Sequence, residues 1–303
     1  MTDLDGFDHL HAQRTDEVNF WRPSPRPLGP IPAGAPFAFK LKSPRNRIGG
    51  VGFFVNAWDV PLSMAWQAFA TRNGFSDYAA FRAKILSLHA PDASPDPVIR
   101  CHALTDVTFF TDQEQFGPPD WSANIVSGRM FDTEKADGAR LWDELAARLA
   151  NRQRAFSSES LAVGPRYGVP LLVKPRLGQG AFRFEVMEAY RRRCAVTGER
   201  TLPVLEAAHI RPFASEGPHA LENGIFLRSD IHALFDLGYL TVRRDGGARD
   251  LRLVVSGRIR EEYENGRDYY ALHDKVLANL PERPEALPSR EFLQWHNDAV
   301  YRG

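Results

Sequence analysis

Cysteine is scarce in this sequence: its 303 residues include two, Cys101 and Cys194, and neither belongs to a CxxC pair. A disulfide framework needs several paired cysteines and a cysteine-based zinc site needs closely spaced ones, so we expect neither. So little cysteine suits a reducing compartment, and the sequence predicts a cytoplasmic protein.

Long apolar runs are also missing. The first twenty residues, MTDLDGFDHLHAQRTDEVNF, are polar and acidic, unlike the apolar segment of a signal peptide. No run elsewhere approaches the length that spans a bilayer, so we expect no membrane partner.

Net charge is absent as well, because 38 Lys and Arg balance 38 Asp and Glu. No overall positive field attracts a polyanion, although a local basic stripe is enough to bind nucleic acid. Most of the cations are arginine, whose planar guanidinium binds phosphate through two hydrogen bonds.

The length of the chain favours two domains. Pro and Gly crowd residues 21–36, which makes 1–36 a lead-in rather than part of a core. Ser, Gly and Pro return at 157–170, SSESLAVGPRYGVP, which we interpret as a linker. The sequence therefore predicts a first domain at 37–156 and a second at 171–303.

Hydrophobic periodicity predicts strands and helices in both domains. The first domain is expected to hold strands at 37–42, 47–58 and 97–110 and helices at 61–74, 76–88 and 138–156. The second is expected to hold a helix at 180–193, strands at 204–210 and 223–228, and a short helix at 229–237. The predicted fold class is α+β, with a mixed α/β first domain.

The stretch LEAAHIRPFASEGPHALENGIFLRSDIHALFD, residues 205–236, concentrates polar residues of catalytic types. On the predicted elements, His209 lies near the end of the first strand and Asn223 opens the second. His232 and Asp236 are four residues apart on the helix, so they share one helix face. Each residue alone has an ordinary alternative, since His209 could be a strand-end histidine and Asp236 a helix-end cap.

The residue types in this stretch suit phosphodiester hydrolysis. That reaction needs a base to activate water and a cation to stabilise the charge that develops on the phosphate. Imidazole, with an ordinary pKa of about 6.5, is a suitable base near neutral pH. One divalent ion held by nitrogen and oxygen ligands then suffices.

The segments AAHI, NGIFLRSDIH and ALFDLGYL resemble the HNH nuclease family and its ββα-metal motif. The likeness extends over about 171–240 and includes PRLGQGAFRFEVMEAYRRRCAVTGE. The resemblance implies that His209 is the general base, that Asn223 holds the base-bearing loop, and that His232 is a metal ligand. It also implies one divalent ion, most suitably Mg²⁺.

The sequence departs from the family at Ala208, where family members carry an acidic or histidine metal ligand. Either Glu206, two residues earlier on the same strand face, takes its place, or Asp236 and water complete the site. His219, in the loop, is interpreted as a solvated residue rather than a ligand.

Arg176, Gln179 and Arg183 precede the motif in the segment RLGQGAFR. They are candidate DNA-phosphate contacts, and a solvated helix start is the alternative.

The first domain resembles N-terminal regions that are joined to HNH domains in bacterial restriction-like proteins. Such regions include small β-barrel readers of modified or flipped bases, which need aromatic walls and polar edges. Trp58, Trp121 and Asn124 are the candidates for such a pocket, whereas Trp66 lies on the apolar face of a predicted helix and is expected in the core.

These features together predict a metal-dependent endonuclease that restricts base-modified double-stranded DNA, as a homodimer at least on DNA. Two alternatives stay open. One is an HNH nuclease of repair or mobile-element nicking, and the other is a non-catalytic DNA-binding module.

Overall fold

The computed structural model describes residues 2–90, 92–119, 121, 125, 128–157 and 177–303. The chain divides into two compact units, Met1–Arg176 and Leu177–Gly303. In the described ranges, no helix has both the length and the apolar character needed to cross a membrane. Of the predicted linker 157–170, only Ser157 lies within the described residues, where it ends a helix.

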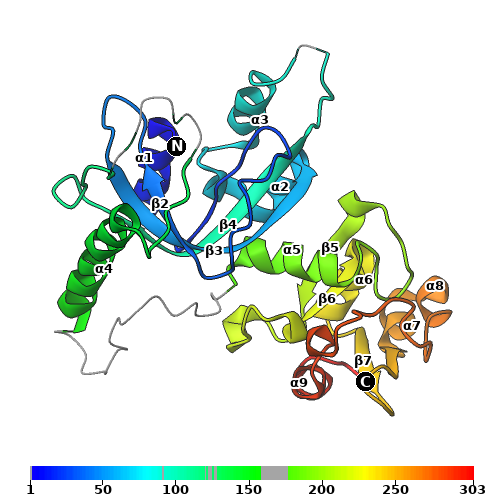
Figure 1. Ribbon diagram of the computed structural model, residues 1–303. Helices are drawn as coiled ribbons and strands as arrows, with labels where there is room; N and C mark the ends of the chain where they lie inside the picture. The colour runs from blue at the N-terminus through cyan, green and yellow to red at the C-terminus, as the bar shows by residue number, and fades with distance from the viewer. Residues whose placement is uncertain (1, 91, 120, 122–124, 126–127, 158–176) are drawn as a thin grey trace. The chain divides into compact units, whose positions relative to one another are not determined.

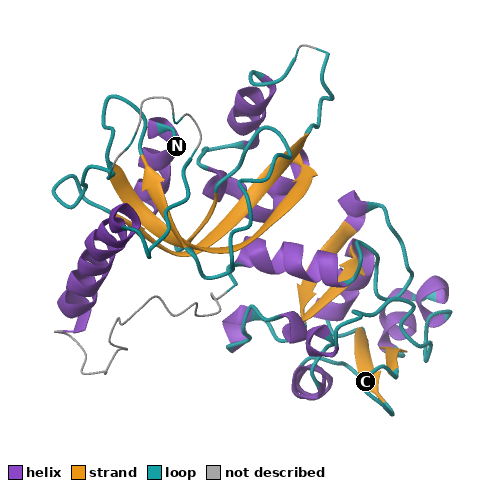
Figure 2. Cartoon of the chain, viewed as in Figure 1, coloured by secondary structure: helices purple, strands orange, loops and turns teal. Residues whose placement is uncertain are grey.

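The first unit is built on an antiparallel sheet with the strand order β1-β4-β3-β2 (Figures 1 and 2). Its strands are β1 (Glu17–Asn19), β2 (Pro36–Lys40), β3 (Ile48–Pro61) and β4 (Val98–Phe109). The long strands β3 and β4 form the centre, and β1 and β2 form the edges. The described part of this sheet is therefore open, and the predicted barrel is not seen in it.

The helices of this unit are α1 (Leu4–Gln13), α2 (Leu62–Phe69), α3 (Tyr78–Leu86) and α4 (Ala136–Ser157), with a 3-10 turn at Ala70–Asn73. Three of them, α2 to α4, were predicted from hydrophobic periodicity. The fourth, α1, falls in the segment 1–36 that the sequence presented as a lead-in.

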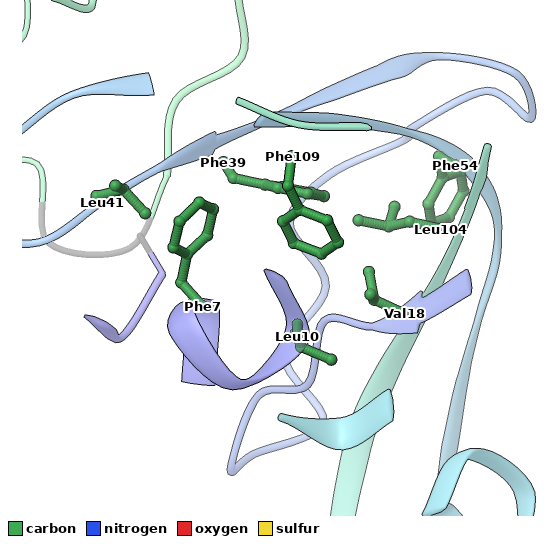
Figure 3. Packing of buried hydrophobic residues seen from close by; sticks show 8 residues of the cluster. All are labelled: Phe7, Leu10, Val18, Phe39, Leu41, Phe54, Leu104 and Phe109. Carbon is green, nitrogen blue, oxygen red and sulfur yellow. The ribbon is translucent and has the colours of Figure 1, made fainter. Parts of the chain in front are cut away.

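The interpretation of 1–36 as a lead-in is wrong for its first half. Phe7 and Leu10 lie three residues apart on one face of α1 and pack against Phe39, Leu104 and Phe109 of the sheet (Figure 3). Val18 of β1 joins the same cluster, so these elements belong to the core of the unit. The Pro-rich stretch that follows, up to β2, contains no helix or named strand, as its composition predicts.

The helix α4 covers a second apolar cluster. Its Leu141 and Leu145 pack with Ile48, Val51 and Phe110. Phe110 directly follows Phe109 of the first cluster, and neighbouring residues of an extended chain point to opposite faces. We conclude that α1 and α4 cover opposite faces of the sheet.

The second unit contains two hairpins and their helices. Its elements, in chain order, are α5 (Gln179–Ala189), β5 (Leu205–His209), β6 (Gly224–Arg228), α6 (Ser229–Asp236), β7 (Leu240–Arg244), β8 (Leu251–Val255), α7 (Arg258–Tyr263), α8 (Arg267–Tyr270) and α9 (Arg290–Ala299), with 3-10 turns at Leu202–Val204, Phe213–Ser215, Leu221–Asn223 and Pro284–Ala286. The predicted strand–loop–strand–helix unit is β5, β6 and α6 (Figure 1).

The β5–β6 hairpin is antiparallel, and its register places His209 opposite Gly224. Helix α5 packs closely on this hairpin: a Cβ atom at Gly224 would lie 2.4 Å from Cγ2 of Val186 and 3.1 Å from Phe182. Glycine at 224 therefore permits the approach that brings Phe182 to the end of β5.

Candidate active site

The end of strand β5 presents His209 beside α5. The imidazole stacks on the Phe182 ring, with 3.9 Å between ring centroids and 12° between ring planes. Its Nε2 atom lies 2.9 Å from Nδ1 of His219. One stacked ring and one hydrogen bond therefore fix the orientation of His209.

Burial, followed by the neighbouring His219 and His232, lowers the pKa of His209 to about 4. Burial acts in this way because a low-polarity environment disfavours the charged imidazolium. At neutral pH the ring is uncharged, and a neutral imidazole can accept a proton.

Asn223 lies at the end of the loop between β5 and β6. Its side chain is fully buried and forms hydrogen bonds to the backbone of that loop. Its Oδ1 accepts from the Arg211 amide, and its Nδ2 donates to the carbonyls of Arg211 and Pro218, each at 2.9 Å. The side chain thus holds both ends of the loop that follows His209. This geometry is what a loop-holding residue requires.

His232, on α6, lies between two carboxylates. Its Nδ1 is 2.6 Å from Oε2 of Glu206, and its Nε2 is 3.3 Å from Oδ2 of Asp236. The second contact follows from the i, i+4 spacing on the helix. The structure therefore brings together all three residues that the sequence offered as metal ligands.

Asp236 shows the electrostatic character of this cluster. Partial burial raises its pKa and the negative charge of Glu206 raises it further, whereas His232 acts in the opposite direction. Two carboxylates that repel each other beside an imidazole form a donor set that suits a hard divalent cation. In the described residues these side chains pair with one another, and no group of three or more His, Cys, Asp or Glu is arranged as a metal site.

Ala208, where a ligand was missing, is fully buried in the hairpin. Glu206 lies two residues earlier on β5 and reaches His232, as described above. Of the two alternatives left open by the sequence, the structure therefore places Glu206 at the cluster together with Asp236.

The residues that the sequence offered as DNA contacts lie in different environments. Arg183 is half-buried on α5; burial lowers its pKa, and the negative charge of Glu206 opposes that shift. Gln179 is exposed and begins α5. Arg176 lies outside the described residues.

Sequence reasoning missed two residues of this site. His219 is half-buried and contacts His209, so its interpretation as a solvated loop residue is wrong. Phe182 stacks on the His209 ring. Its apolar position on α5 was visible in the sequence, but the hairpin contact that brings it to His209 is not local.

The predicted base pocket of the first unit is only partly supported by the positions of its residues. Trp58 lies in β3 with 6% of its surface exposed, so it is a core residue rather than the wall of an open pocket. Asn124 lies outside the described residues. Trp121 lines a cavity of about 500 Å³ whose other aromatic walls are Phe20, Phe37, Phe131 and Trp142.

Lys40 lies at the same cavity, and its Nζ atom is 5.4 Å from the centroid of the Trp121 ring. Burial lowers the pKa of Lys40, and its ammonium donates a hydrogen bond to Oδ1 of Asn46. The lining of the cavity is mainly apolar and includes two cations, Lys40 and Arg129.

Comparison with known proteins finds a family whose model matches part of the second unit. Residues 194–243 match the family model described as HNH endonuclease. No curated protein matches the sequence. A solved structure, a modification-dependent TagI restriction endonuclease, is similar at 14% identity and a TM-score of 0.28, covering 82% of this chain.

The chain spans about half of that structure, 53% of its length. The family match, by contrast, includes β5, β6 and α6 and with them His209, Asn223, His232 and both carboxylates. The second unit therefore contains a domain of the HNH endonuclease family.

Proposed function

We propose that this chain is a metal-dependent endonuclease that cleaves double-stranded DNA carrying modified bases. The observation that supports the proposal best is the juxtaposition of a neutral imidazole, His209, with the Glu206–His232–Asp236 cluster. A proton acceptor and an anionic cation-binding set are the two parts that phosphodiester hydrolysis needs.

In the proposed reaction His209 takes a proton from water. The water oxygen forms a new bond to phosphorus, and the bond from phosphorus to the leaving sugar oxygen breaks. The leaving oxygen then takes a proton from solvent, and His209 returns its proton to solvent. Phe182 orients the imidazole throughout, since the stacked ring leaves it little freedom to rotate.

Glu206, His232 and Asp236 are the residues that would hold the metal, most suitably Mg²⁺. When bound, the ion would stabilise negative charge on the phosphate. Two residues of this chain are proposed to supply the rest. Arg183, whose charge interacts with that of Glu206, would hold a phosphate oxygen through its guanidinium, and Asn223 would fix the loop. Gln179 and Arg176 are proposed to contact the DNA backbone alongside Arg183.

The first unit is proposed to read the base modification. Trp121 and the other aromatic walls of the cavity offer faces on which a flipped base could stack. Cleavage of both strands needs two active sites for an enzyme with one site per chain, so we propose a homodimer at least on DNA.

The test is to incubate the wild type and His209→Ala with unmodified and base-modified phage DNA, each with Mg²⁺ and with EDTA. We expect wild-type cleavage of modified DNA with Mg²⁺ only. Absence of wild-type cleavage on every DNA would contradict the nuclease proposal. Equal cleavage of all DNAs would contradict modification dependence but would agree with the proposed hydrolysis.

A further inference from the structure

His219 lies in the loop that Asn223 closes, next to the proposed base. Its Nδ1 atom is 2.9 Å from Nε2 of His209. The Phe213 ring stacks on His219 with 5.0 Å between centroids and 3° between planes. Asn223 donates to the carbonyl of Pro218, the residue directly before His219. The position of this imidazole is therefore built by the loop.

A hydrogen bond between two ring nitrogens couples the tautomers of the two histidines, because one nitrogen must carry the proton and the other must accept it. If His209 donates from Nε2, its Nδ1 carries a lone pair. If His219 donates instead, Nδ1 of His209 carries the proton and the neutral ring has no basic nitrogen left for water.

The two nitrogens of His209 differ in their surroundings. Nε2 is used by His219, whereas Nδ1 has no hydrogen-bond partner among the described residues. Nδ1 is thus the nitrogen that is left to form a hydrogen bond with a water molecule. Nδ1 can accept a proton from that water only when His209 donates from Nε2 to His219.

We propose that His219 is a positioning residue: it accepts the Nε2 proton of His209 and so holds the base in the tautomer with its lone pair on Nδ1. This proposal rests on the proposed nuclease function. When Nδ1 takes the proton of water, Nε2 keeps its proton and its partner, so the ring does not have to reorient during the transfer.

A neutral partner suits this role better than a carboxylate would. A carboxylate at this position would favour the imidazolium and raise the pKa of the base. An imidazole fixes the tautomer without adding a negative charge, and the base stays unprotonated at neutral pH.

The tautomer can be measured directly, without cleavage. In ¹⁵N-histidine-labelled wild type at neutral pH, we expect the protein to show His209 protonated at Nε2. We also expect a scalar coupling across the hydrogen bond to Nδ1 of His219. The proposal would be overturned if the spectra placed the proton of neutral His209 on Nδ1, or if they showed that Nδ1 of His219 donates the hydrogen bond.

The functional consequence is tested with matched variants under single-turnover conditions on the DNA that the wild type cleaves. We expect His219→Leu to lower the cleavage rate by about 10- to 100-fold with little change in DNA affinity, as loss of an orienting partner does. His219→Asn places an amide oxygen near the position of Nδ1 and should recover most of the lost rate. His273→Leu, which removes an exposed histidine elsewhere in the same unit, is the control.

Equal rates for His219→Leu and His273→Leu would overturn the proposal, as would an unchanged His209 tautomer in His219→Leu. If His219→Leu fails to fold, the coupling in the wild type still decides. If the wild type cleaves no DNA, the proposed function fails, while the tautomer measurement gives its own answer.

Discussion

The two units of this chain use their polar residues in different ways. In the second unit, Glu206 and Asp236 both contact His232, whose charge also acts on His209. In the first unit, the residues singled out by type are dispersed: Trp58 is in the core and Trp121 lines a cavity. A site made by one contiguous segment can be recognised from spacing, whereas a pocket assembled from distant segments cannot.

The largest expected effect comes from the Glu206–His232–Asp236 cluster, which we propose holds the metal. His232→Ala removes the side chain to which both Glu206 and Asp236 are bound. We expect cleavage with Mg²⁺ to fall by roughly three orders of magnitude, because loss of the ion removes its charge stabilisation. Calorimetric titration should show the loss of divalent-cation binding.

The control for this variant is Trp58→Phe in the first unit, which should leave cation binding intact. Cation binding by His232→Ala with wild-type affinity would show that the ligands lie elsewhere.

Asn223→Ala tests how the active-site loop is held. The change leaves the Arg211 and Pro218 backbone groups without their buried partner, so we expect a loss of about 3 kcal/mol in the free energy of unfolding of the second unit. Urea denaturation measures this. Asn223→Asp keeps the acceptor but places a carboxylate oxygen against the carbonyls of Arg211 and Pro218 in a buried site, so it should show a loss at least as large. A change below about 1 kcal/mol for Asn223→Ala would mean that these bonds contribute little.

Acid should destabilise the second unit through His296, which is buried with 2% of its surface exposed. Burial lowers the pKa of His296 to about 4, against about 6.5 for an unfolded histidine. Between these values the unfolded chain binds more protons, so the free energy of unfolding falls as pH drops from 6.5 towards 4, by up to about 1.4 kcal/mol per pH unit.

The measurement is urea denaturation across that pH range for the wild type and His296→Gln. The variant should lose the part of the pH slope that His296 contributes, because glutamine does not titrate. Identical slopes for the two proteins would contradict the assigned pKa.

The smallest effect should come from the proposed reader. Trp121→Ala removes one aromatic wall of the cavity. If a base stacks there, the preference for modified over unmodified DNA should fall by about tenfold, in line with the contribution of one stacking contact. Competition binding with the two DNAs measures this ratio. An unchanged ratio would contradict the proposal that the modified base binds in this cavity.

Periodicity and spacing were sufficient for much of the fold, because β2 to β4, α2 to α5 and the hairpin with α6 all carry local signals. The helix α1 was missed, since its apolar residues Phe7 and Leu10 are few and the following Pro-rich stretch dominated the interpretation. The open sheet could not be derived, because strand order depends on contacts between distant segments.

The site shows the same division. His209, Asn223 and His232 were singled out through their resemblance to the HNH motif, and the pairing of His232 with Asp236 follows from their i, i+4 spacing. The contact of His219 with His209 depends on how the loop folds back, and the place of Phe182 depends on the packing of α5 at Gly224. These contacts required the structure.

The most direct measurement is the single-turnover rate of DNA cleavage by the wild type and by His209→Ala, at saturating Mg²⁺ and with folding checked by thermal denaturation. The proposed general base should be worth about 10²- to 10⁴-fold, so we expect the variant to bind DNA normally and to cleave it slower by that factor. Equal cleavage rates for the two proteins would contradict the assignment of His209 as the base.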